Sequence, residues 1–86
     1  MEYVLSKQFE KDFSKLPKPV KAKVVLAFEK FVKDEEDHSL HNHALAGKWN
    51  NHHSINVTGD IRAVYVYADT EIIRFVAIGS RSKLYG

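Results

Sequence analysis

Apolar residues recur at helical spacing in the first part of the chain. The opening run EYVL favours a short first strand. Phe9, Phe13 and Leu16 then follow one another three or four residues apart, which is the spacing of one helix face. Ser6 precedes this stretch, and its hydroxyl can accept a free N–H group of the first helical turn. The pattern predicts a helix over Lys7–Leu16.

A second helical pattern begins at two closely spaced prolines. Pro17 and Pro19 end the first helix and open the next, because proline is tolerated in a first helical turn but not in a helix interior. We predict this second helix over Val20–Asp34 and a helical hairpin that covers one face of a sheet, with the lysine-rich side facing solvent. Its apolar stripe consists of Val20, Val24, Phe28, Phe31 and Val32. The side chains expected to be mostly buried are Phe9, Phe13, Val24, Phe28 and Phe31.

The remainder of the chain changes to a strand pattern. Asp37–His53 has no clear period and is predicted to be a long loop. Three strands follow, over Ser54–Thr58, Ile61–Ala68 and Ile72–Ile78, with the sequences TGD and ADTE as turns. Because short turns connect antiparallel neighbours, the order strand, helix, helix, three strands predicts a single α+β domain over residues 1–86 with a small antiparallel sheet.

Side-chain alternation then gives a register. If Asp69 and Thr70 form the last turn, Arg62 lies opposite Ala77 and shares a face with Gly79. The polar residues near the strand ends should therefore gather at one end of the sheet. They are Asn56, Asp60, Arg62, Arg81 (if the chain stays extended past Gly79) and Tyr85.

Composition narrows the class of protein. The chain has 86 residues, a formal charge of +2 and no cysteine, which excludes disulfides, iron–sulfur clusters and thiolate zinc sites. The net charge is too small to identify a nucleic-acid-binding protein by itself. No signal peptide and no apolar run of membrane-spanning length is present. We expect a soluble cytoplasmic protein without a membrane partner.

The two arginines indicate an anion site. Arg62 and Arg81 would repel one another on one sheet end unless an anion lies between them, and a guanidinium matches the geometry of phosphate. Tyr85 can stack on a base or transfer a proton, and Lys48 and Trp49 add a cation and a flat ring. This set favours a site for an RNA or DNA backbone.

A structural role for the arginines is the alternative. In that interpretation Arg62 and Arg81 simply pair with Asp60 and Glu71.

The histidines all lie between His38 and His53. His41 and His43 could share a side and bind a metal, but no carboxylate or cysteine completes a ligand set at the usual spacing, so we expect no metal and no cofactor. One histidine in acid–base chemistry is a better candidate, because its pKa lies near neutrality. The others are expected to be solvent-exposed loop residues.

Three motifs carry a resemblance to a known family. The segments HALAGKW, GDIRAVY and the closing IGSRSKLYG resemble the RelE/ParE superfamily of toxins from bacterial type II toxin–antitoxin pairs, and most of all its YafQ-like branch. The resemblance implies a small antiparallel sheet against two N-terminal helices. It also implies mRNA cleavage on the ribosome, in which a ribose 2′-OH attacks the adjacent phosphate to give a 2′,3′-cyclic phosphate. The implied partners are a cognate antitoxin, the ribosome and mRNA, with the toxin alone a monomer and the complex a hetero-oligomer.

The resemblance also implies site residues. His43 and Asp60 match YafQ-type positions, Arg62 matches a phosphate-binding arginine, and Arg81 and Tyr85 stand where RelE has arginine and tyrosine. We expect His43 or Asp60 to be the base, the arginines to stabilise charge, and Tyr85 to align or protonate. The expected catalytic set is His43, Asp60, Arg62, Arg81 and Tyr85, with RNA binding by Lys48, Trp49, Arg74 and Lys83.

Two departures from the family pattern leave other functions open. Asn56 and Ala77 occupy positions of a YafQ histidine and arginine, so the site is a hybrid. The alternatives are a ParE-like inhibitor of DNA gyrase and an inactive member that only binds an antitoxin.

Overall fold

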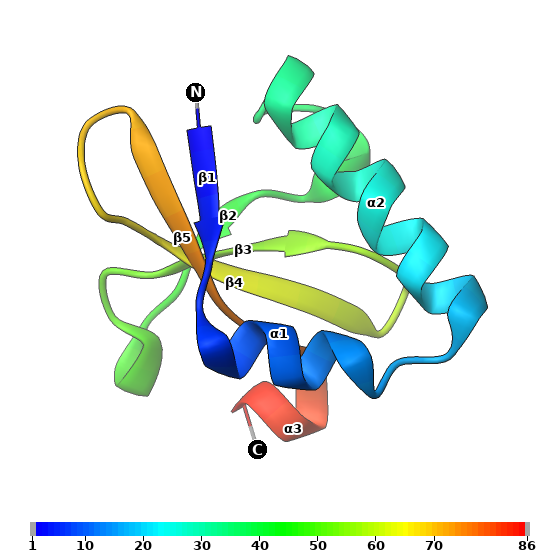
Figure 1. The fold of residues 1–86 in the computed structure, drawn as a ribbon. Helices are drawn as coiled ribbons and strands as arrows, with labels where there is room; N and C mark the ends of the chain where they lie inside the picture. Colours follow the sequence, from blue (N-terminus) through cyan, green and yellow to red (C-terminus); the bar gives the residue numbers. More distant parts are fainter. Residues whose placement is uncertain (1, 86) are drawn as a thin grey trace.

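The chain folds into a five-stranded sheet with two longer helices on one side (Figure 1). The computed structural model describes residues 2–85, so the two end residues of the domain expected over 1–86 lie outside the described residues. The elements are β1 (Glu2–Leu5), α1 (Lys7–Ser14), α2 (Lys18–Lys33), η1 (His38–Leu40), β2 (His43–Ala44), η2 (Gly47–Trp49), β3 (His53–Asn56), β4 (Ile61–Tyr67), β5 (Ile72–Ser80) and α3 (Arg81–Tyr85). None of the helices in this described range is long and apolar enough to cross a membrane.

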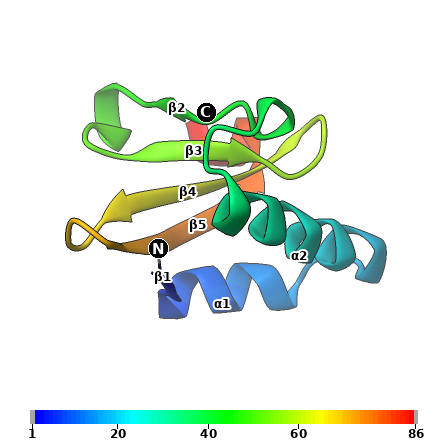
Figure 2. The same ribbon diagram turned by 90° about the horizontal axis from the view of Figure 1, so that it is seen from above.

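The strands lie side by side in the order β1-β5-β4-β3-β2 (Figure 2). The pairs β5–β4, β4–β3 and β3–β2 are antiparallel, but β1 runs parallel to β5. The α+β prediction is confirmed, whereas the sheet is mixed at its β1 edge. The antiparallel prediction was based on short turns between neighbouring strands. No short turn connects β1 to β5, because almost the whole chain lies between them. A parallel pair needs such a long crossover connection.

The two helices have the expected order and slightly different ends. Ser6 caps α1 as predicted, since its hydroxyl accepts the Phe9 N–H at 3.0 Å. The first helix ends at Ser14, two residues before the predicted end, because the residue preceding a proline avoids the helical conformation. Pro17 is the N-cap of α2, and Pro19 lies in its first turn.

The helices cover one face of the sheet with aromatic rings. Phe28 stacks on Phe75 of β5 with ring centroids 4.3 Å apart, and Phe9 and Phe31 are likewise buried. Phe13 is only half-buried. The predicted stripe is wrong at its last position, because Val32 is 50% exposed. It lines an open apolar groove between β1, α1 and α2, because it lies about 100° around the helix from Phe31, whose ring packs on Phe75.

The register of β4 and β5 differs from the prediction. Arg62 lies opposite Gly79 rather than Ala77. The connecting loop is longer than the two residues assumed, and an irregularity at Val64/Tyr65 leaves Val76 of β5 without a partner. The resulting displacement is an even number of residues, so Arg62 still shares its face with Ala77 and Gly79.

The segment expected to be a featureless loop contains structure. Between Asp37 and His53 the chain forms η1, β2 and η2, and Leu40 is fully buried beneath the helices. The backbone of His41 has a φ of 46°, in the left-handed region that few non-glycine residues adopt. The tail also differs, because the chain turns into α3 at Arg81 and does not stay extended.

Candidate functional site

Arg62 is the centre of the site on the sheet face opposite α1 and α2. Its side chain is 2% exposed. The guanidinium donates to Ser54 Oγ at 3.0 Å, to Asn56 Oδ1 at 2.6 Å and to the main-chain oxygen of His41 at 3.1 Å. Strand pairing explains these contacts, because Asn56 lies directly opposite Arg62 and Ser54 follows two residues away on the same face. Neutral groups therefore hold a buried cation.

No carboxylate compensates this charge. Within residues 2–85 the only ion pair joins Lys83 to Asp12, so the alternative pairing of the arginines with Asp60 and Glu71 is wrong. Burial lowers the pKa of Arg62 below its usual value; Tyr85 opposes this effect and the nearby charge of Arg81 adds to it. A guanidinium nevertheless remains protonated in proteins. The site thus contains a positive charge that the described protein groups leave unpaired.

The structure brings His43 to this arginine. The Nδ1 atom of His43 lies 2.8 Å from the main-chain oxygen of His41 and 3.4 Å from Arg62 Nη2. Because a carbonyl can only accept, we assign the proton to Nδ1. In the neutral imidazole the other ring nitrogen, Nε2, is then unprotonated and can accept a proton.

A pocket of about 470 Å³ connects His43 with the C-terminal helix. Tyr85 lies in its wall together with Lys48, and Arg62 lies close enough to Tyr85 and to Arg81 for both to influence its pKa. Asn56, Arg62, Arg81 and Tyr85 therefore lie at one end of the sheet, as predicted. Arg81 and Tyr85 reach this end because the chain forms α3, not because it stays extended. The full lining is His43, Leu45, Ala46, Gly47, Lys48, Trp49 and Tyr85.

The C-terminal helix that carries Arg81 and Tyr85 is attached on two sides. The indole Nε1 of Trp49 donates to the main-chain oxygen of Leu84 at 2.8 Å, and Lys83 Nζ lies 3.3 Å from Asp12 Oδ1 on α1. Leu84 is buried among residues of β4 and β5. The position of Tyr85 therefore depends on residues far away in the sequence.

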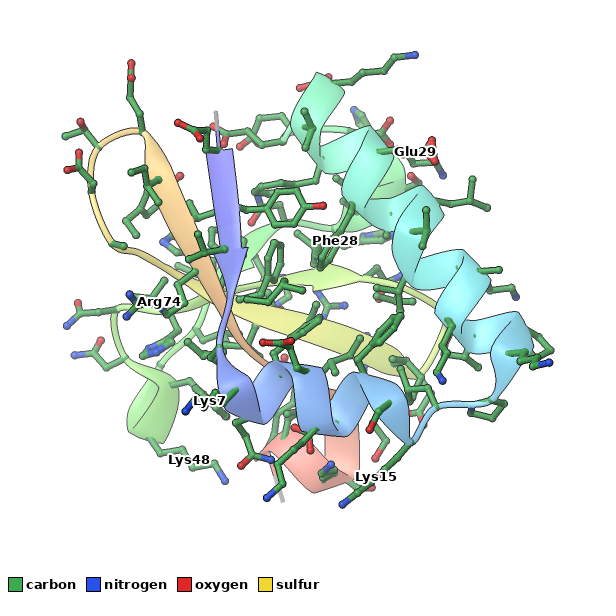
Figure 3. The ribbon with its side chains drawn as sticks, in the orientation of Figure 1. Lys7, Lys15, Phe28, Glu29, Lys48 and Arg74 are labelled. Carbon is green, nitrogen blue, oxygen red and sulfur yellow. The ribbon has the colours of Figure 1, made fainter. Side chains whose placement is uncertain are left out.

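Three predicted site residues lie outside this arrangement. Asp60 is exposed in the turn between β3 and β4, at the correct sheet end, but it does not line the pocket. Arg74 is exposed and lies toward the end of β5 that is far from the site. Figure 3 shows the Arg74 side chain extending away from α2. Lys83, expected to bind RNA, is paired with Asp12.

Sequence reasoning missed two groups that hold Arg62. Ser54 has the same strand parity as Asn56, so side-chain alternation along this strand could have found it. The contribution of His41 comes from its main-chain oxygen, and no side-chain pattern signals that.

The described part of the chain holds no group of three or more histidine, aspartate or glutamate side chains arranged for a metal ion.

Comparison with known proteins identifies the family. The family model described as "Bacterial toxin of type II toxin-antitoxin system, YafQ" matches residues 1–86. A search of curated proteins finds no match.

Solved structures agree with this assignment. YafQ from E. coli strain BL21(DE3) superposes with a TM-score of 0.80 at 22% identity, covering 98% of this chain and 97% of that one. A copper-bound mutant toxin from Helicobacter pylori gives 0.70 at 29% identity, with 99% of both chains covered. The toxin chain of the E. coli DinJ–YafQ complex gives 0.75 at 21% identity, covering 98% of this chain and 96% of that one. Because the family model matches residues 1–86 of this chain, the chain belongs to the YafQ family of bacterial toxins from type II toxin–antitoxin systems.

Proposed function

We propose that this toxin is a ribosome-dependent mRNA interferase. The observation that carries the proposal is the buried guanidinium of Arg62, which has no carboxylate partner in the described chain and lies beside a second arginine, Arg81. A buried charge without a partner is costly, and such charges are often found where an anionic ligand supplies the missing partner. A phosphodiester in the adjacent pocket fits that requirement.

The two arginines have different roles in binding the phosphate. Arg81 is exposed and can donate directly to phosphate oxygens, whereas Arg62 is covered and acts through its nearby charge. Coulomb attraction is stronger in a poorly solvated site than in water, so a fixed charge below the pocket stabilises the extra negative charge of the transition state. Lys48 lies in the pocket wall and extends the positive surface along the RNA.

His43 and Tyr85 suit the proton transfers. In the proposed step the ribose 2′-oxygen forms a bond to phosphorus and gives its proton to His43 Nε2. The bond between phosphorus and the 5′-oxygen breaks, and the Tyr85 hydroxyl donates a proton to that leaving oxygen. The products are a 2′,3′-cyclic phosphate and a 5′-OH. We favour His43 over Asp60 as the base because His43 and Tyr85 line one pocket.

The proposed partners follow from the same function. The solved relatives include a toxin bound to its antitoxin, DinJ with YafQ. We propose a cognate antitoxin for this chain, in a cytoplasmic hetero-oligomer, with a monomeric free toxin. An acidic antitoxin segment would mask the basic pocket, so its affinity should fall as salt rises. An affinity that is flat with salt would instead favour apolar docking of a helix.

Purified ribosomes and a defined mRNA test the activity. Primer extension after incubation with the toxin should map cuts on ribosome-bound mRNA and none on free mRNA, and the downstream fragment should carry a 5′-OH that accepts phosphate from a kinase. A parallel supercoiling assay with DNA gyrase tests the ParE-like alternative. Intact mRNA together with inhibited gyrase would overturn the proposal, and neither effect would indicate an inactive antitoxin-binding member.

A further inference from the structure

The C-terminal helix α3 is too short to be stable by itself. It spans Arg81–Tyr85, and isolated helices of this length do not form in water. Its start is capped by Ser80, whose hydroxyl accepts the Lys83 N–H at 3.2 Å. Its end carries main-chain oxygens without helical partners, which need donors from elsewhere in the protein. The geometry of α3 is therefore determined by tertiary contacts.

Trp49 supplies the donor at the end of α3. The indole N–H, which can only donate, points at the Leu84 oxygen at 2.8 Å. The two residues are 35 positions apart in the sequence. The Trp49 ring also packs against the small cluster that Leu84 forms with Val64 and Ala77. One side chain thus fixes both the main chain and the side chain of Leu84, the residue directly before Tyr85.

We infer that Trp49 is a positioning residue that acts through Tyr85. By holding the Leu84 oxygen it keeps the Tyr85 hydroxyl at the pocket that His43 also lines. This inference rests on the proposed function and replaces the sequence-based expectation that Trp49 is a stacking platform for RNA. A ring whose N–H is bound to the protein, and whose body packs on Leu84, serves the fold of the site.

The variant Trp49→Phe separates the two roles. It keeps an aromatic ring that can pack and stack but removes the donor to Leu84. Without this donor the Leu84 carbonyl is no longer held and the Tyr85 hydroxyl is placed less accurately in the docked helix, so kcat should fall about fivefold or more while KM stays within about twofold. A stacking platform predicts the reverse: near-normal kinetics in Trp49→Phe and a raised KM in Trp49→Ala. That result would overturn the inference.

A double variant tests whether Trp49 acts through Tyr85. If the indole only places the tyrosine hydroxyl, adding Trp49→Phe to Tyr85→Phe should lower kcat no further. Independent roles would instead multiply the two losses. Multiplied losses would contradict the inference even if each single variant behaved as expected.

Trypsin provides a test that needs no RNA cleavage. The enzyme cuts after Arg81 and Lys83, and productive cleavage requires α3 to leave the protein surface. Trp49→Phe should speed cutting at these sites about fivefold relative to wild type. Tyr67→Phe is the matched control, because this exposed ring lies on the far end of β4 and should not change the rate. Unchanged cutting in Trp49→Phe would overturn the inference.

The outcomes distinguish this inference from the proposed function. If the wild type cuts no mRNA on ribosomes, the proposed function has failed, but faster trypsin cutting in Trp49→Phe would still support Trp49 as the anchor of α3. A second variant, Asp12→Asn, weakens the other attachment at Lys83. It should have a smaller effect on trypsin cutting than Trp49→Phe, because Lys83 is 57% exposed and its ion pair is screened by solvent.

Discussion

The two faces of the sheet bury different kinds of side chain. On the face toward α1 and α2, Phe28 and Phe31 pack on Phe75 with no polar side chain between the rings. On the opposite face, the buried centre is a guanidinium held by Ser54 and other neutral groups. The first face is covered by two helices, and the second by short segments: the stretch from His41 to Trp49 and the five residues of α3.

This difference separates stability from chemistry. Aromatic burial contributes strongly to folding because each ring removes a large apolar surface from water. A buried cation without a carboxylate contributes little or costs stability, and such a cost is typical of sites that await a ligand. Substitutions on the helical face should therefore change the free energy of unfolding, and those on the other face should change activity.

The largest expected effect is on the helical face. Phe75→Ala removes a ring that contacts Phe9, Phe28, Phe31 and Tyr65, and should lower the free energy of unfolding by about 3–5 kcal/mol. Urea denaturation followed by circular dichroism measures this. The control Val32→Ala, at a half-exposed position, should cost far less. Equal losses would mean that the aromatic face is not the stability centre.

Arg81→Ala should produce the opposite kind of change. Losing one donor to the phosphate of the transition state costs on the order of 100- to 1000-fold in rate, or about 3–4 kcal/mol. The urea midpoint should stay near wild type, because Arg81 is exposed. Single-turnover cleavage on ribosomes measures the rate. Intact cleavage in Arg81→Ala would show that the site has been placed wrongly.

Tyr85→Phe tests the hydroxyl separately from the ring. If Tyr85 protonates the leaving oxygen, the rate should fall about 100-fold with little change in ribosome binding. The same single-turnover assay measures it, with a binding assay on ribosomes as control. Activity close to wild type would make the ring a stacking platform and leave another group to protonate the leaving oxygen.

A smaller effect is expected where the two faces meet. The Tyr65 hydroxyl donates to Asn42 Oδ1 at 2.9 Å and connects the core to the loop before β2. Tyr65→Phe should lower the free energy of unfolding by about 1 kcal/mol in urea denaturation. Asn42→Ala in the Tyr65→Phe background should then cost less than Asn42→Ala in the wild type. Additive losses would show that the two side chains stabilise the fold independently.

The smallest effect concerns Asp37, which lies outside both faces. Hydrogen bonds from the Ser39 hydroxyl and main-chain N–H lower the pKa of Asp37 below 3.8. Because the folded pKa is depressed, the stabilisation is present above pH 3.8 and is lost as pH falls through the lowered value. The urea midpoints of wild type and Asp37→Ala should differ slightly at pH 6 and converge as the pH falls below 3.8. A difference that grew toward low pH would contradict the assignment.

Much of the fold could be predicted from local patterns. The spacing of Phe9 and Phe28, the cap at Ser6 and the alternation in β4 each depend on near neighbours in the sequence, and each was confirmed. The stripe failed at Val32, which lines an open groove beside the sheet although the neighbouring Phe31 is buried against Phe75. Local periodicity predicts which side of a helix is apolar but not how far the partner surface extends.

The sequence predicted which residues form the site better than it predicted how these residues are arranged. Strand parity placed Arg62 on one face with Ala77 and Gly79, and the observed register keeps them there despite its displacement. Asn56 was expected at the same sheet end from its place near a strand end, and it lies opposite Arg62. The arrival of Tyr85 beside Arg62 was expected for a different reason, an extended tail, whereas the chain forms a helix after Ser80. The roles of His43, Asp60, Arg81 and the RNA-binding residues stay predictions until cleavage is measured.

The sequence by itself determined the two long helices, the strands β1, β3, β4 and β5, the aromatic layer and the presence of a cation on the other sheet face, because these follow from patterns of residues close together in the chain. Only the tertiary structure decided that Arg62 is held without a carboxylate and that Trp49 donates a hydrogen bond to the helix that carries Tyr85. Such contacts join residues tens of positions apart, and their geometry depends on the loop length and the strand irregularity that set the register. No local pattern contains that information.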